Sequence, residues 1–111
     1  MDTTTQLYVE PSAIVVGLPD DMLALCHEYL PPGGLAVKRV AHAHAACERI
    51  AVLLPRLVVV PADMRAADLD LIEDRAAAVG AIVLHLEADH GYELLGAQLD
   101  LTVQDLRAKY S

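Results

Sequence analysis

The sequence has no tryptophan and no phenylalanine, and only four of its 111 residues are tyrosines. Aromatic side chains supply many anchors of protein interfaces and the stacking platforms that hold single-stranded nucleic acids. Basic residues are also scarce, because eight Lys and Arg stand against sixteen Asp and Glu, giving a formal net charge of −8. These shortages argue against binding to nucleic acid or to an anionic membrane, and they favour a basic protein partner.

Long apolar runs and disulfide-type cysteine patterns are missing as well. No apolar stretch reaches the ~18–20 residues of a membrane-spanning helix. Residues 1–10 lack the basic region followed by an apolar region that marks a signal peptide. Cys26 and Cys47 are the only cysteines, and each falls among apolar residues of an expected helix. We therefore expect a cytoplasmic protein without disulfide bonds.

The sequence is rich in apolar residues, which make up 55% of the chain against 22% charged residues. A chain of this length and composition is suited to one hydrophobic core. We expect a flexible lead-in over residues 1–12 and a single domain over residues 13–111.

Strand and helix patterns alternate along the chain. Continuous apolar runs predict strands at 13–17, 57–60 and 81–86, and mixed runs predict strands at 35–40 and 98–103. Helical spacing predicts helices at 20–30, 42–54 and 66–79, and a last short helix from about 102 to 110. Residues 87–96 leave little room between strands, so the fourth helix is expected to be shortened.

This alternation predicts an α/β fold with one parallel sheet and right-handed crossovers. Continuous apolar strands are typical of the centre of such a sheet, where both faces are covered, and mixed strands are typical of its edges. The resulting strand order is 2-1-3-4-5, the flavodoxin-like doubly wound arrangement.

One stretch of the sequence indicates a family. A helix with the paired alanines Ala45 and Ala46 leads through Pro55 into the strand at 57–60. This pattern resembles the receiver domain of two-component response regulators, and the similarity extends from Ala13 to Leu86. The resemblance implies a signalling module with the predicted flavodoxin-like fold.

The resemblance also implies a phosphorylation pocket, from which this sequence departs. A receiver carries its phosphoryl-acceptor aspartate at the end of the third strand, where this chain has Pro61. The acidic pair that holds Mg²⁺ in receivers is replaced by Gly17 and Leu18. His85 stands in place of the Ser or Thr that closes the fourth strand, and the receiver lysine has no match. We therefore interpret the chain as a pseudo-receiver with a degenerate pocket formed by these four residues.

Histidines and cysteines offer a different kind of site. His44 and Cys47 would share a helix face and suit Zn²⁺, but His42 would not share it and no further ligand completes a set. Cys26 and His27 are sequence neighbours, so on a helix their side chains point about 100° apart, which disfavours a nucleophile–base pair. We expect no metal and no catalytic residue.

Aspartates offer a last candidate site. Asp20, Asp21 and Asp63 follow strands, at the side of a doubly wound sheet where ligands bind. Helix capping and turn formation account for the same residues without a cation.

The favoured function is a non-catalytic signalling or scaffolding module that acts through protein–protein contact without phosphorylation or cofactor. The candidate partner surface comprises Tyr92, Leu94, Leu95, Leu99 and Tyr110. A homodimer could cover strand edges that a shortened fourth helix leaves exposed. The alternative is a small-ligand or metal-binding domain, or a small enzyme, that uses His85 or Asp63 in the strand-end cleft.

Overall fold

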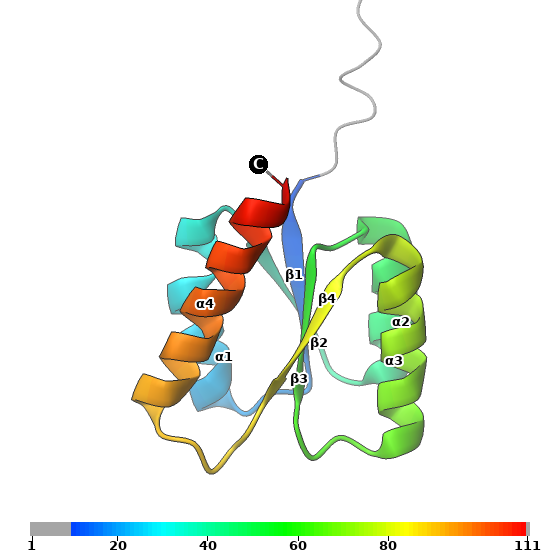
Figure 1. The fold of residues 1–111 in the computed structure, drawn as a ribbon. Coiled ribbons are helices and arrows are strands. Elements are labelled where there is room, and N and C mark those ends of the chain that lie inside the picture. The colour runs from blue at the N-terminus through cyan, green and yellow to red at the C-terminus, as the bar shows by residue number, and fades with distance from the viewer. Residues whose placement is uncertain (1–9, 111) are drawn as a thin grey trace, which may run out of the picture.

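The computed structural model describes residues 10–110, so most of the predicted lead-in lies outside the described residues. Strands and helices alternate throughout this part of the chain (Figure 1). The elements are β1 Ser12–Val16, α1 Asp20–Tyr29, the 3-10 turn η2 Pro31–Gly33, β2 Ala36–Val40, α2 Ala43–Leu53, β3 Leu57–Pro61, α3 Ala66–Val79, β4 Ile82–Leu86 and α4 Tyr92–Tyr110. No helix within residues 10–110 is both long and apolar enough to cross a membrane.

The four strands form one parallel sheet in the order β2-β1-β3-β4. At the centre, Ile14 of β1 pairs with Lys38 of β2 on one side and with Val58 of β3 on the other. All five residues of β1 are buried, as expected for a strand with neighbours on both sides and helices on both faces. The predicted α/β, flavodoxin-like architecture is confirmed through its first four strands.

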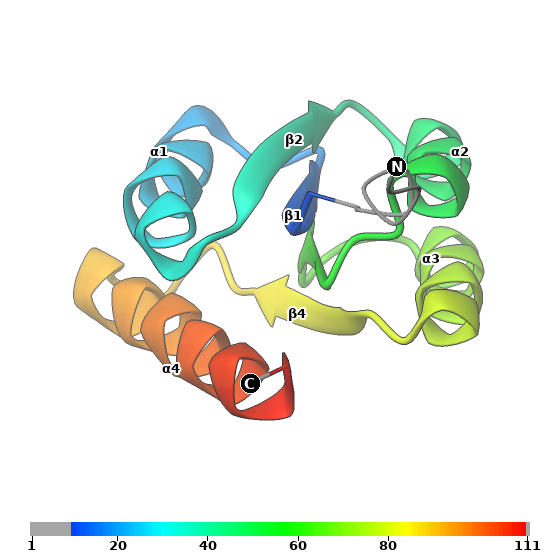
Figure 2. The ribbon, with the colours of Figure 1, turned by 90° about the horizontal axis from the view of Figure 1, so that it is seen from above.

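Two helices cover each face of the sheet (Figure 2). Because side chains alternate along a strand, Val15 points to the face covered by α1 and α4, where it joins a core that includes Leu99. Ile14 points to the opposite face, where it joins Ile72 in the core beneath α2 and α3. The sheet is therefore the middle layer of three, with one hydrophobic core on each side.

Two glycines end elements where the backbone turns left-handed. Gly80 follows α3 with φ of 76° and is the C-cap of this helix. Gly17 follows β1 with φ of 59°, and a β-carbon placed there would lie 3.1 Å from the carbonyl oxygen of Ala41. Gly17 thus allows the chain to turn from β1 toward α1 close beside the chain that leaves β2.

The prediction for the C-terminal segment is wrong. Residues 92–110 form one 19-residue helix, with neither a shortened fourth helix nor a fifth strand at 98–103. Leu99 and Val103 are buried, whereas Leu101 between them is 60% exposed, which is a helical and not a strand pattern. Thr102, where the predicted last helix begins, lies within α4 and donates its hydroxyl hydrogen to the carbonyl of Gln98 at 2.8 Å.

Strand β4 also differs from its predicted position. Its continuous apolar run predicts a central strand, but within residues 10–110 it pairs only with β3 and forms an edge of the sheet. Four of its five residues are accordingly half-buried, and only Leu86 is fully buried.

Candidate functional site

The four residues of the predicted degenerate pocket lie in or beyond the carboxyl-terminal halves of the strands. Gly17 and Leu18 follow β1, Pro61 is the last residue of β3, and His85 is the next-to-last residue of β4. Pro61 pairs with Leu86, which brings the ends of β3 and β4 side by side. Leu18 is buried, so this end of β1 presents an apolar side chain to the core.

His85 does not lie beside Gly17, because β3 separates β4 from β1. It pairs with Val60 on β3, and β1 lies one strand further away. Its side chain points to the α3 face, where Nε2 lies 3.5 Å from a carboxylate oxygen of Glu73. Both side chains are partly exposed, so their attraction, present only when His85 is protonated, is screened by water.

The three strand-end aspartates fall on two segments, the start of α1 and the turn after β3. Asp20 is the first residue of α1, not its N-cap, which is Pro19. Asp21 accepts the backbone N–H of Met22 at 2.8 Å through one oxygen, while Asp63 is exposed in the turn after β3. Within residues 10–110 no three His, Cys, Asp or Glu residues gather in a way that could hold a metal ion.

The histidines and cysteines of the helices have structural positions. His42 is the N-cap of α2, and its Nδ1 accepts the backbone N–H of Ala45 at 3.3 Å. Cys26 is fully buried in the core beneath α1, and burial raises the pKa of its thiol to about 12. A thiol with this pKa is protonated at neutral pH and cannot act as a nucleophile there. Cys47 is half-buried against the opposite core.

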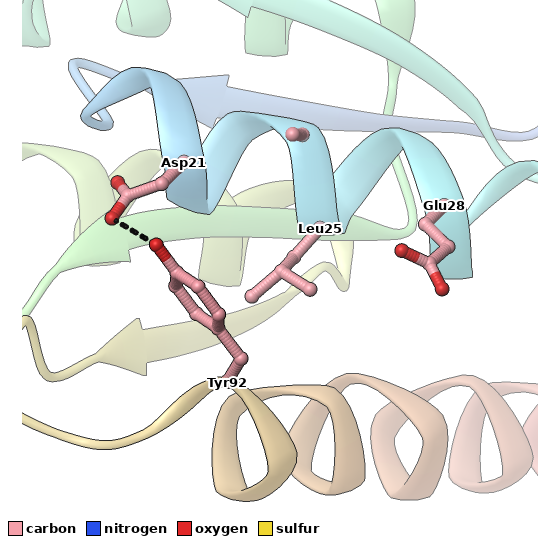
Figure 3. Close-up of a pocket in the computed structure, with 5 residues that line it drawn as sticks. Asp21, Leu25, Glu28 and Tyr92 are labelled. Carbon is pink, nitrogen blue, oxygen red and sulfur yellow. Dashed lines mark hydrogen bonds between the residues drawn. The ribbon is translucent and has the colours of Figure 1, made fainter.

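A groove between α1 and α4 brings distant parts of the sequence together (Figure 3). It has a volume of about 280 Å³, and the residues that line it are Asp21, Ala24, Leu25, Glu28 and Tyr92. The hydroxyl of Tyr92 donates a hydrogen bond to Asp21 Oδ2 at 3.0 Å across 71 sequence positions. This hydrogen bond and the negative charge of Asp21 raise the pKa of the Tyr92 phenol.

The groove combines two carboxylates with apolar surface. Asp21 and Glu28 lie two helical turns apart on α1, with the half-buried Leu25 between them. The ring of Tyr92, 60% exposed, faces Leu25 from α4. A lysine or arginine side chain suits such a surface, because its charged end can approach the carboxylates while its methylene stem covers the leucine and the ring.

The predicted partner surface is only partly accessible. Tyr92, Leu94 and Tyr110 are exposed, whereas Leu95 and Leu99 are buried in the core and cannot contact a partner. The prediction placed Leu95 in a shortened fourth helix and Leu99 in an edge strand at 98–103, and not in one long helix packed on the core. Tyr92 and Tyr110 stand at opposite ends of α4, about 27 Å apart along the helix axis. The exposed aromatic residues therefore do not form one patch.

The sequence could not predict the groove. Asp21, Leu25 and Glu28 follow a helical spacing that puts them on one side of α1, which is a visible signal in the sequence. The other wall belongs to α4, and a prediction that ends the helix and starts a strand cannot place Tyr92 against α1.

Comparison with known proteins identifies a similar fold. The structure matches the signal receiver domain of a putative Luxo repressor protein from Vibrio parahaemolyticus, with a TM-score of 0.65. The match has 13% sequence identity and covers 91% of this chain and 95% of that domain. No family model and no curated protein matches the sequence. The chain is thus similar to a receiver domain in fold, and the residues themselves must carry any conclusion about function.

Proposed function

We propose that this chain is a non-catalytic signalling module that binds other proteins and is not phosphorylated. The observation that carries the proposal is Pro61 at the end of β3, because proline has no group that can accept a phosphoryl. Gly17 and Leu18 after β1 add no carboxylate that could hold Mg²⁺. A receiver-like fold with these residues can still contact other proteins, but it lacks the groups needed for phosphorylation.

The acidic groove between α1 and α4 is the proposed contact surface for a basic partner. Asp21 and Glu28 supply negative charge, and the net charge of −8 steers a positively charged partner toward the molecule. Leu25 and Tyr92 supply apolar surface that a simple counter-ion does not need. The occupant that fits is a peptide segment carrying Lys or Arg together with an apolar residue.

Phosphorylation is tested by thermal unfolding with Mg²⁺ and beryllofluoride, which mimics a phosphoryl group on aspartate. We expect no change in Tm, and no mass increase after incubation with acetyl phosphate. The matched variant is Pro61→Asp, which puts a carboxylate at the position where receivers carry their acceptor aspartate. Stabilisation of the natural sequence by beryllofluoride, or its phosphorylation, would contradict the proposal.

Groove binding is tested with a short peptide of alternating lysine and leucine, monitored by NMR chemical shifts. We expect shifts concentrated on Asp21, Leu25 and Tyr92, and weaker binding in the variant Glu28→Gln. The control is Glu48→Gln, which removes the same charge from an exposed position on α2. Equal weakening by both variants would mean that the peptide responds only to net charge, and the groove would be rejected.

The alternative function, a ligand or metal site at the strand ends, has weaker support. His85 lies beside Glu73, and Asp63 is exposed in a separate turn. The same thermal measurement with Zn²⁺ tests this alternative directly, since a bound ion raises Tm.

A further inference from the structure

Strand β4 has one edge whose backbone groups find no partner among residues 10–110. Ile82 donates its N–H to Arg56 at 3.0 Å, and Leu86 accepts the N–H of Ala62 at 2.9 Å. Residues of a parallel strand alternate between the neighbour on one side and the neighbour on the other. Val83 and His85 therefore direct their N–H and C=O groups away from β3, toward the place where a further strand would pair.

The side chains of β4 also suit a covered strand. Ile82, Val83 and Leu84 are apolar and half-buried, and His85 is the only ionisable residue of the strand. Free edges in natural proteins usually carry charged residues that discourage pairing with another chain. The edge of β4 lacks that protection.

We propose that two copies of this chain pair through their β4 strands, antiparallel about a twofold axis near Leu84. The two parallel sheets then join into one continuous sheet, and Val83 and His85 of each copy bond to the other. A twofold interface uses the same surface on both copies, so the open edge of β4 can be covered by a second copy without a different protein. The inference goes beyond the proposed function, because it names a second copy as the partner of the sheet edge.

The position of α4 agrees with the same axis. Lys109 donates from Nζ to the carbonyl of Gly80 at 3.0 Å, which holds the end of α4 beside the start of β4. Leu84 lies about 13 Å further along the strand, and ~9 residues of a helix cover that distance. An axis through Leu84 therefore passes α4 near Asp100, close to the middle of the helix, and the two copies of α4 run antiparallel beside each other.

Apolar surface on α4 favours that antiparallel arrangement. Leu94 and Leu101 are exposed and lie two turns apart on one side of the helix. Because Leu101 is one residue from the level of the axis, antiparallel pairing brings the Leu101 side chains of the two copies close together. A second copy thus complements this edge in backbone and apolar surface.

Proline substitution provides a test with a matched control. Val83→Pro removes an N–H that faces the open edge, and proline is tolerated at such positions because no existing ladder bond is lost. Val37→Pro does the same on the opposite edge, where Ala36 and Val40 make the bonds to the chain beside β2 and Val37 faces away. Sedimentation equilibrium is expected to give a dimer for the natural sequence and for Val37→Pro. The Val83→Pro variant is expected to dissociate at least about tenfold more readily, which corresponds to ~1.4 kcal/mol.

A second variant keeps the test informative if a proline impairs folding. Leu101→Asp changes an exposed side chain without touching the strand, and it places two negative charges close together at the axis, one on each copy. We expect the same weakening of the dimer with an unchanged circular dichroism spectrum. Hydrogen exchange supplies the direct reading, because the amides of Val83 and His85 should slow as protein concentration rises while those of Val37 and Arg39 do not.

Several results overturn the pairing of β4. One is a monomer at high protein concentration, and another is a dimer that Val83→Pro and Leu101→Asp leave unchanged. A third is concentration-independent protection of Val83 and His85 that disappears when residues 2–9 are deleted, which would mean that the chain covers its own edge. None of these results bears on phosphorylation, and a response to beryllofluoride would leave the pairing intact, so the two proposals fail separately.

Discussion

The two edges of the sheet are built alike but end in different surfaces. Strand β2 lies between α1 and α2, and β4 lies between α4 and α3 (Figure 2). Each edge strand has five residues and pairs in parallel with one inner strand. Strand β2 carries Lys38 and Arg39, and Lys38 forms an ion pair with Glu10 at 3.7 Å, whereas β4 has no permanently charged residue. The two edges therefore differ in their side chains and not in their position, and the charged side chains of β2 protect it from pairing with another chain.

The position of β4 at an edge follows from the path of the chain after this strand. Helix α4 crosses to the face already covered by α1, where Gly96 permits a close approach to Tyr29. A β-carbon on residue 96 would lie 2.6 Å from the Tyr29 hydroxyl oxygen, so this contact needs glycine. The chain thus completes its second core with a helix and leaves no strand beside β4 among the described residues. Completing a core and completing a sheet are therefore separate requirements in this fold.

The largest effect on stability is expected in α4, because only a helix buries Leu99 while it exposes Leu101. Leu99→Ala removes a fully buried side chain from the core beneath α4 and should cost about 2–5 kcal/mol of unfolding free energy. Leu101→Ala, on the exposed side of the same helix, should cost under about 0.5 kcal/mol. Urea denaturation of the two variants measures both values. Similar large losses would mean that Leu99 and Leu101 share a buried face, as they would in a strand lying beside β4.

The fold up to Leu86 could be predicted from the sequence because its signals are local. Helix α3 matches its predicted range of 66–79, since a helical apolar pattern ends at a left-handed glycine, Gly80. The runs at 57–60 and 81–86 consist mainly of β-branched and other apolar residues, which few other structures accommodate. The order of the first three strands could be predicted from their apolar or mixed character. Strand β4 is the exception, because an apolar run does not distinguish a central strand from an unprotected edge strand.

The C-terminal segment and the groove could not be predicted because their signals are not local. Leu99 and Val103 fit both a two-residue and a helical period, so the choice depends on contacts with α1 and the sheet. Gly96 is typical of a helix end in sequence, but here its role is the contact with Tyr29. The bond between Tyr92 and Asp21 requires knowing that α4 lies against α1.

An intermediate effect is expected from removing the protection of the β2 edge. Arg39→Val replaces an exposed charged residue with a β-branched apolar one, which makes β2 resemble β4. We expect additional self-association at high concentration, seen by sedimentation as species larger than those of the natural sequence. The control is Arg75→Val, which removes the same charge from an exposed position on α3. Unchanged association of Arg39→Val would mean that charge does not distinguish the two edges.

A smaller effect concerns the two cysteines, both on helices that flank the β2 half of the sheet. The buried thiol of Cys26, with its pKa raised to about 12, should resist alkylation in the folded protein at pH 8, while the half-buried Cys47 reacts first. In the unfolded chain Cys26 ionises near 9.0, so its contribution to stability is complete below pH 9 and is lost as pH rises toward 12. Mass spectrometry of labelled protein identifies the site, and Cys26→Ala should reduce the alkaline loss of stability. Rapid labelling of Cys26 at pH 8 would show that the core beside α1 opens readily.

The smallest effect is expected at the hydrogen bond that joins the helices of the two edges. Tyr92 belongs to α4 on the β4 side and Asp21 to α1 on the β2 side, and Asp21 raises the pKa of the Tyr92 phenol. An ultraviolet titration should therefore find one tyrosine ionising above its ordinary pKa of 10.0, a component that Tyr92→Phe removes. Asp21→Asn should lower that pKa, whereas Asp20→Asn, which removes the same charge next to it, should change it less because Asp20 makes no bond to the phenol. If the two asparagine variants gave the same curve, the first turn of α4 would not be docked on α1 in solution. The groove between α1 and α4 would then not persist in solution, because the start of α4 would move independently of α1.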